Sequence, residues 1–182
     1  MVIGGMDGTK YDLFMVFKSN VAKDQDKQAF NDAKQHGFGR ILWNEVSKLQ
    51  SDYSMMIYGN RAGWWNAKIT VAFLKHHFGD RNPMSPPKLL LLDHFSGHWT
   101  DEVVSFAKSV NVHLLKIPAG MTWRCQPADV AWMKALKDRL RSLWVAELRR
   151  ELDNRQEGVP FKMVAPTRAT VAAWVKAAWD LG

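Results

Sequence analysis

The chain has 182 residues, of which 47% are hydrophobic, and its 25 Lys+Arg against 18 Asp+Glu give a formal net charge of +7. This length fits one domain with a substantial core, and the composition excludes wholesale disorder. A single cysteine, Cys125, excludes an internal disulfide and a four-cysteine zinc site and fits a reducing intracellular compartment; no apolar run reaches the roughly 18 residues of a membrane span.

The first half of the chain predicts two strands and a helix. Residues 1–17 read as a hairpin with a turn at Asp7–Gly8 and alternating apolar positions after it. Residues 19–42 are polar and weakly periodic, which predicts an excursion from the core with room for a short helix. Between residues 63 and 79 the apolar spacing predicts a helix that Gly79 ends.

The second half predicts a β-α-β unit followed by two helices. "KLLLLD" reads as a short strand buried on both faces, Thr100 and the two acids after it predict a helix start, and "NVHLLKIP" reads as the next strand. The crossover implies that residues 88–117 pair their strands in parallel. Beyond Pro127 the spacing predicts the longest helix, and a final helix is predicted after Pro166–Thr167.

Two carboxylates stand where a metal ion could bind. Asp93 ends the leucine run, and ligands of α/β proteins gather at the carboxyl ends of parallel strands. Asp129 falls in the first turn of the long helix, where the helix dipole favours an acid, so a simple capping role is the competing interpretation. Two carboxylates on separate elements can hold Mg²⁺ or Mn²⁺ for phosphodiester chemistry, although such sites usually need a third.

The stretch "LLLLDHFSGHWTDEVVSFAKSVNVHLLKIPAGMTWRCQPADVAWMKALKDRL" closely resembles the core of the DDE superfamily endonucleases, the transposase-derived domain of pogo, Tigger and Jerky-like elements and of centromere protein B relatives. Upstream, "MDGTKYDLFMVFKSN" resembles the family's hairpin, so the resemblance covers roughly residues 1–145. The matching marks, in order, are Asp93 with His98, Pro118, Thr122, Gln126–Pro127 and Asp129.

The resemblance implies an α/β fold of the ribonuclease H-like type, with a mixed sheet, flanking helices and three metal-binding acids. Asp93 would be the second acid and Asp129 the third, and their separation, 129 − 93 = 36 positions, agrees with the family. His98 and Gln126 would support the site, although His98 could equally be a packing residue. The implied cofactor is Mg²⁺ or Mn²⁺, and the implied location is the nucleus.

The family's first acid lies on a strand before the hairpin, and this chain begins inside the hairpin. We therefore expect the first strand and its acid to be missing, with neither Asp7 nor Asp12 a convincing replacement. The usual helix-turn-helix module is absent as well. The chain reads as a fragment, whether a decayed copy, a truncated gene model or a domesticated remnant, with weak or no nuclease activity and an unpaired sheet edge that favours self-association.

We divide the chain into a DDE endonuclease-like core, residues 1–150, and a helical extension of the same domain, residues 151–182. The expected partner is DNA, with no membrane and no small-molecule cofactor. The alternatives are a non-enzymatic DNA- or protein-binding module with vestigial acids, and an unrelated α/β binding domain. Two sets of side chains could contact nucleic acid or simply face solvent and core: the cations Lys134, Lys137 and Arg141, and the indoles Trp64, Trp65 and Trp99.

Overall fold

The computed structural model describes residues 1–156 and 158–180. Its internal contacts divide the chain into two compact units, Met1–Pro127 and Ala128–Gly182. The predicted α/β class is confirmed, because helices alternate with short parallel strands in the first unit. Its elements are β1 (Leu13–Lys18), α1 (Gln25–Lys34), α2 (Arg40–Tyr53), β2 (Met55–Asn60), α3 (Ala67–Phe78), β3 (Lys88–Leu92), η1 (Ser96–His98), α4 (Asp101–Ser109), β4 (Val112–Lys116) and α5 (Thr122–Cys125).

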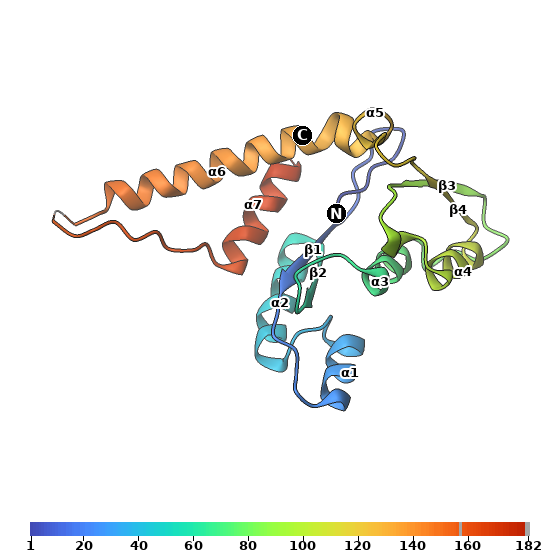
Figure 1. The fold of residues 1–182 in the computed structure, drawn as a ribbon, viewed down its shortest axis with the longest axis horizontal. Coiled ribbons are helices and arrows are strands. Elements are labelled where there is room, and N and C mark those ends of the chain that lie inside the picture. Colours follow the sequence, from blue (N-terminus) through green and yellow to red (C-terminus); the bar gives the residue numbers. More distant parts are fainter. Residues whose placement is uncertain (157, 181–182) are drawn as a thin grey trace. The chain divides into compact units, whose positions relative to one another are not determined.

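The strands form two parallel pairs, β1 with β2 and β3 with β4 (Figure 1). The second pair and α4 make the β-α-β unit predicted for residues 88–117. The family resemblance implied one mixed sheet, whereas within the described residues the structure has two separate parallel pairs that share no hydrogen-bonded strands. The first arm of the hairpin pairs beside β1 through one antiparallel bridge, Gly4 to Lys10, because adjacent glycines at positions 4 and 5 weaken a strand.

Helix α3 is the central element of the first unit. Asn66 caps it, with its Oδ1 accepting from the Ile69 N–H at 3.0 Å, and Gly79 follows its last turn as the sequence predicts. Phe14 of β1 and Val103 of α4 belong to the same buried core as the apolar side chains of this helix, and the Phe14 ring packs edge-on against Phe73 with ring centres 5.2 Å apart. The helix thus ties the β-α-β unit to β1. Its buried side chains are Ile69, Thr70, Val71, Phe73, Leu74 and Phe78.

A second group of buried side chains lies between α2 and β2. Phe38, Val46 and Ile57 are fully buried there, and Leu49 is nearly so. The sequence predicted an excursion with a short helix over residues 19–42, whereas the structure has α1, α2 and then β2. Strand β2 is the partner of β1 in the first parallel pair, and α2 packs on it. This region is therefore part of the folded core.

The second unit consists of a π-helical turn, η2 (Ala128–Trp132), that leads directly into α6 (Met133–Asp153), and α7 (Arg168–Asp180). Both predicted helices are therefore confirmed. The centres of the Trp132 and Trp179 rings lie 6.2 Å apart, and those of the Trp144 and Trp174 rings lie 6.1 Å apart, so the two helices run antiparallel where these rings meet. Across residues 1–156 and 158–180, no helix combines the length and apolarity that crossing a membrane requires.

Candidate metal centre around Asp93

Asp93 follows β3 directly, and the backbone around it is held by hydrogen bonds. The Phe95 N–H donates to Asp93 Oδ1 at 2.9 Å, and the indole N–H of Trp99 donates to the Asp93 carbonyl oxygen at 2.9 Å. The side chain is 36% exposed, and its Oδ2 accepts no hydrogen bond from the described residues. One carboxylate oxygen is therefore anchored while the other has no partner among the described residues, an arrangement that suits a metal ligand.

Behind Asp93 lies a buried histidine. His98 is 4% exposed, and its Nε2 lies 3.4 Å from Asp93 Oδ1. On the other side of the ring, Nδ1 lies 3.1 Å from the hydroxyl oxygen of Thr70, which is fully buried. The indole N–H of Trp65 donates to that same hydroxyl oxygen at 2.9 Å. Four side chains are thus connected in one line: Trp65 from the loop before α3, Thr70 from α3, His98 from η1 and Asp93 from the loop after β3.

The surroundings of His98 determine its charge and which of its ring nitrogens carries the proton. Burial lowers the pKa of His98, an effect that the negative charge of Asp93 opposes, so the ring is neutral near pH 7. A neutral ring can face a carboxylate only with its N–H, which places the proton on Nε2 and leaves Nδ1 as an acceptor. Thr70 has a single hydroxyl hydrogen, which is within reach of the Asn66 carbonyl oxygen and of Nδ1, each at 3.1 Å, and in this tautomer it is donated to Nδ1. The result is a chain of hydrogen bonds, called the relay below, in which each side chain donates to the next from Trp65 through Thr70 and His98 to Asp93.

We expect Thr70→Val to destabilise the protein by about 1–3 kcal/mol, the cost of leaving buried polar groups without a partner. The substitution keeps the shape of the side chain but removes the hydroxyl on which Trp65 and His98 depend. Thr100→Val is the matched control, because Thr100 Oγ1 is buried without a hydrogen-bond partner among the described residues. Urea unfolding measures both; equal losses for the two variants would contradict the relay.

The sequence predicted Asp129 in the first turn of the long helix, whereas the structure places it, exposed, on the π-helical turn η2, four residues before α6 begins. Gln126 lies at the end of α5, and its Oε1 is buried with no hydrogen-bond partner within the described residues. Asp93 belongs to the first unit and Asp129 to the second. Their convergence on one ion stays a prediction, as does the supporting role of Gln126.

The donor chemistry of the two acids suits Mg²⁺ or Mn²⁺, which prefer carboxylate oxygens. In the part of the chain that the structure describes, no group of three or more His, Cys, Asp or Glu side chains is arranged to hold a metal ion. Thr70 had no signal in the sequence, since its contact with His98 joins residues 28 positions apart.

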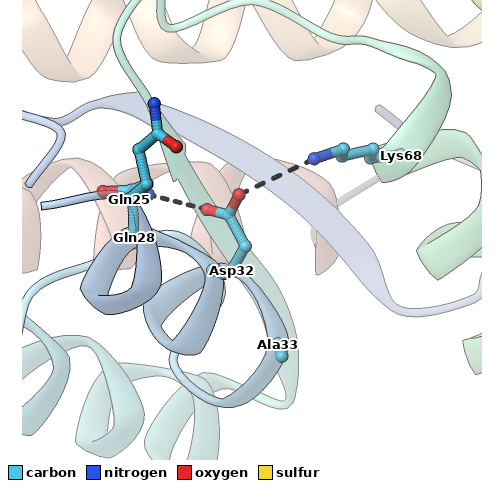
Figure 2. Close-up of a pocket in the computed structure, with 6 residues that line it drawn as sticks. Gln25, Gln28, Asp32, Ala33 and Lys68 are labelled. Carbon is cyan, nitrogen blue, oxygen red and sulfur yellow. Dashed lines mark hydrogen bonds and ion pairs between the residues drawn. The ribbon is translucent and has the colours of Figure 1, made fainter.

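A separate surface pocket lies on α1 (Figure 2). There the amide N–H of Gln28 donates to Asp32 Oδ1 at 2.7 Å, and Lys68 Nζ lies 3.7 Å from Asp32 Oδ2. Both oxygens of this single acid are thus engaged. The pocket contains none of the predicted site residues and offers no second carboxylate, so it does not compete with Asp93 as a metal site. Its lining also includes Gln25, Ala29 and Ala33.

Comparison with known proteins identifies the family. A family model described as DDE superfamily endonuclease matches residues 7–182. The chain belongs to this family. The human protein "Pogo transposable element with KRAB domain" is 32% identical to the DDE-family chain over 90 residues, which are 48% of this chain and 15% of that relative. The resemblance drawn from the stretch containing Asp93 and Asp129 is therefore confirmed. No solved structure matches the chain significantly.

Proposed function

We propose that this chain is a transposase-derived, DNA-binding domain in which Asp93 and Asp129 hold a divalent Mg²⁺ or Mn²⁺ ion. The observation that carries the proposal is the state of Asp93 at a strand end, with one carboxylate oxygen anchored by Phe95 and His98 and the other without a partner among the described residues. Such an ion, when bound, would activate an attacking oxygen and stabilise the leaving one in phosphodiester cleavage.

The ancestral reaction would be metal-dependent cleavage of DNA followed by strand transfer. In this proposal the buried relay from Trp65 to His98 fixes Asp93, and Gln126 supports the site from α5. The 182 residues supply two of the three acids that the family resemblance implies, and two carboxylates hold a divalent ion less well than three. We therefore expect weak or no nicking of supercoiled DNA by this chain with Mg²⁺. Robust nicking that Asp93→Asn abolishes would contradict the impairment.

The second candidate function is a DNA- or protein-binding module in which the acids are vestigial. It is favoured by the cations of α6, because they lie exposed on one helix face and need no metal to contact DNA. Lys134, Lys137 and Arg141 are separated by three and four residues, and Arg141 also pairs with Asp138 at 2.7 Å. Metal binding by the acids separates the two functions, since only the first requires it.

Neutralising these three cations to Gln is expected to weaken duplex DNA binding uniformly across sequences and to lower the salt slope by roughly 3, about one per lost phosphate contact. The matched control replaces Lys27, Lys34 and Lys48 on α1 and α2 by Gln, which removes the same charge elsewhere. Fluorescence anisotropy over a range of salt concentrations measures both. Equal slopes for the two triple variants would show that net charge alone governs binding.

Two further properties are proposed from the family and from the strands. Nuclear residence follows from the family, and a fluorescent fusion excluded from the nucleus would contradict it. Self-association would use the second edge of β3, which pairs only with β4 within the described residues. A strictly monomeric chain in sedimentation at high protein concentration would rule this out.

A further inference from the structure

Three large aromatic side chains are exposed on the segments that follow β2, β3 and β4: Trp64 and Phe95 lie on loops, and Trp123 lies on the short helix α5. Trp64 is 76% exposed, Trp123 is 68% exposed and Phe95 is 42% exposed. Hydrophobic side chains of this size are usually packed in a core or an interface, so their presence on these segments calls for a ligand. Trp65 and Trp99, by contrast, are half-buried and hydrogen-bonded through their indole N–H groups.

The exposed Trp64 is held in place rather than left on a free loop. The side chain of Asn60 accepts hydrogen bonds from the Gly63 N–H at 2.7 Å and the Trp64 N–H at 3.3 Å, and its amide N–H donates to the Trp64 carbonyl oxygen at 2.7 Å. The backbone on both sides of the residue is therefore fixed while the ring stands in solvent. A ring held in this way loses little conformational freedom when a flat ligand stacks on it.

Backbone contacts link the segments that carry these rings to the loop that carries Asp93. A Cβ added to Gly97, in the loop after Asp93, would lie 3.2 Å from the backbone nitrogen of Ala67, so this loop touches the start of α3 three residues after Trp64. Phe95 lies two residues after Asp93, and its ring packs edge-on against the His98 ring with the two ring centres 5.2 Å apart. Because β3 and β4 are parallel, their carboxyl ends meet, and the Ile117 N–H donates to the Leu92 carbonyl oxygen at 2.8 Å, so the chain leaves β4 beside Asp93 and reaches Trp123 of α5 six residues later.

Positive charge accompanies the rings. The guanidinium of Arg124 lies 5.2 Å from the centre of the Trp123 ring, and Lys116 Nζ lies 4.5 Å from the centre of the Trp99 ring. Arg61 is exposed three residues before Trp64. Rings that accept stacked bases, interleaved with cations that accept phosphates, are the chemistry of proteins that bind single-stranded nucleic acid. Bases inside a duplex cannot present a face to such rings, because their neighbours cover them.

We propose that the surface formed by Trp64, Phe95 and Trp123 beside Asp93 binds unpaired nucleotides of DNA, with Trp64 as the main stacking platform. This inference rests on the proposed function only in taking Asp93 as the place where a phosphodiester would lie. It adds that the strand enters this place with its bases exposed, as in a single strand or a frayed end. The stacking itself requires no metal.

The test compares a fluorescent thymidine oligonucleotide with a hairpin-capped duplex, both titrated with the whole chain in EDTA. We expect Trp64→Ala to weaken single-strand binding by roughly 10-fold or more, within the range for one stacked base, and to change duplex binding by less than about twofold. Trp64→Phe, which keeps an aromatic face, should retain most of the affinity. Met84→Ala is the control, because Met84 is 92% exposed but lies before β3, at its other end.

Circular dichroism and thermal melting confirm that each variant is folded. Equal loss of both DNA forms in Trp64→Ala, unchanged affinity for the single strand, or no single-strand binding by the wild type would each overturn the proposal. Calorimetric titration of the wild type with Mn²⁺ separates it from the proposed function: single-strand binding in EDTA should be measurable even if the chain binds no Mn²⁺.

Discussion

Asp93→Asn is expected to lower the affinity of the chain for Mn²⁺ by at least about 10–100-fold. Replacing a residue that only hydrogen-bonds a metal ligand already lowers metal affinity by about that factor, and Asp93 is proposed as a ligand itself. The amide keeps the hydrogen bond that the Phe95 N–H donates and the shape of the side chain, but it removes the negative charge from the oxygen that has no partner among the described residues. Asp129→Asn should cause a loss of the same order, because the proposal places both acids on one ion. Calorimetric titration of the purified chain measures both.

The control for this titration is Asp80→Asn. Asp80 is an exposed acid that precedes β3, so the substitution removes the same charge at the opposite end of the strand from Asp93. It should leave Mn²⁺ binding unchanged. If the wild type binds no Mn²⁺ while remaining folded, the two acids do not form a site in this chain, and the binding-module function becomes the better account.

The largest expected effect on stability comes from Gly37→Ala, at about 3–5 kcal/mol, in the range reserved for specific structural conflicts. Gly37 has φ of +87°, where an L side chain is strained, and a Cβ there would lie 2.0 Å from the carbonyl oxygen of Gly59. The backbone cannot move away easily. The Gly37 N–H donates to the Asn31 carbonyl oxygen at 2.9 Å, and the Gly59 N–H donates to the His36 carbonyl oxygen at 2.8 Å.

Gly8→Ala provides the matched comparison for Gly37→Ala. Gly8 has almost the same φ, +85°, but nothing lies within 4 Å of an added Cβ. Its substitution should therefore cost only the left-handed backbone strain, about 1–2 kcal/mol. Unfolding by urea, followed by tryptophan fluorescence, measures both variants. Similar losses would mean that the contact between residue 37 and β2 does not restrain the fold.

The β-α-β unit, α3 and the long helix could be predicted because their sequences carry strong local signals. "KLLLLD" and "NVHLLKIP" are apolar runs with clear limits, and α3 has a capping Asn66 at one end and Gly79 at the other. These signals depend only on neighbours along the chain. They also place Asp93 at a strand end and Asp129 near the start of the long helix, so the approximate local setting of both acids was accessible from sequence.

Helix α2 and β2 could not be predicted in the same way. Only Val46 and Leu49 are buried on α2, so its apolar face is narrow among many polar residues. The buried positions of β2 are Met55, Ile57 and Gly59, and a glycine weakens the alternating pattern of a strand. The pairing of this strand with β1 stabilises it, and that contact joins residues distant in the sequence.

The relay behind Asp93 was hidden for a related reason. Thr70 lies on a helix and His98 on a loop, and only the packing of α3 against η1 brings them together. Thr100 shows the opposite case: it occupies the N-cap position of α4 as predicted, yet its side chain makes no capping hydrogen bond. Sequence patterns located these residues along the chain, while their hydrogen bonds depend on tertiary structure.

The most direct test of the account is iron-mediated cleavage of the protein itself. Fe²⁺ substituted for Mg²⁺, with ascorbate and peroxide, generates hydroxyl radicals that cut the backbone close to the bound ion. If Asp93 and Asp129 hold one ion, cuts will appear near both residues, and either Asn substitution will remove both sets of cuts. Cuts near only one acid, or cuts that persist when the other acid is replaced, would show that the two carboxylates do not share a metal site.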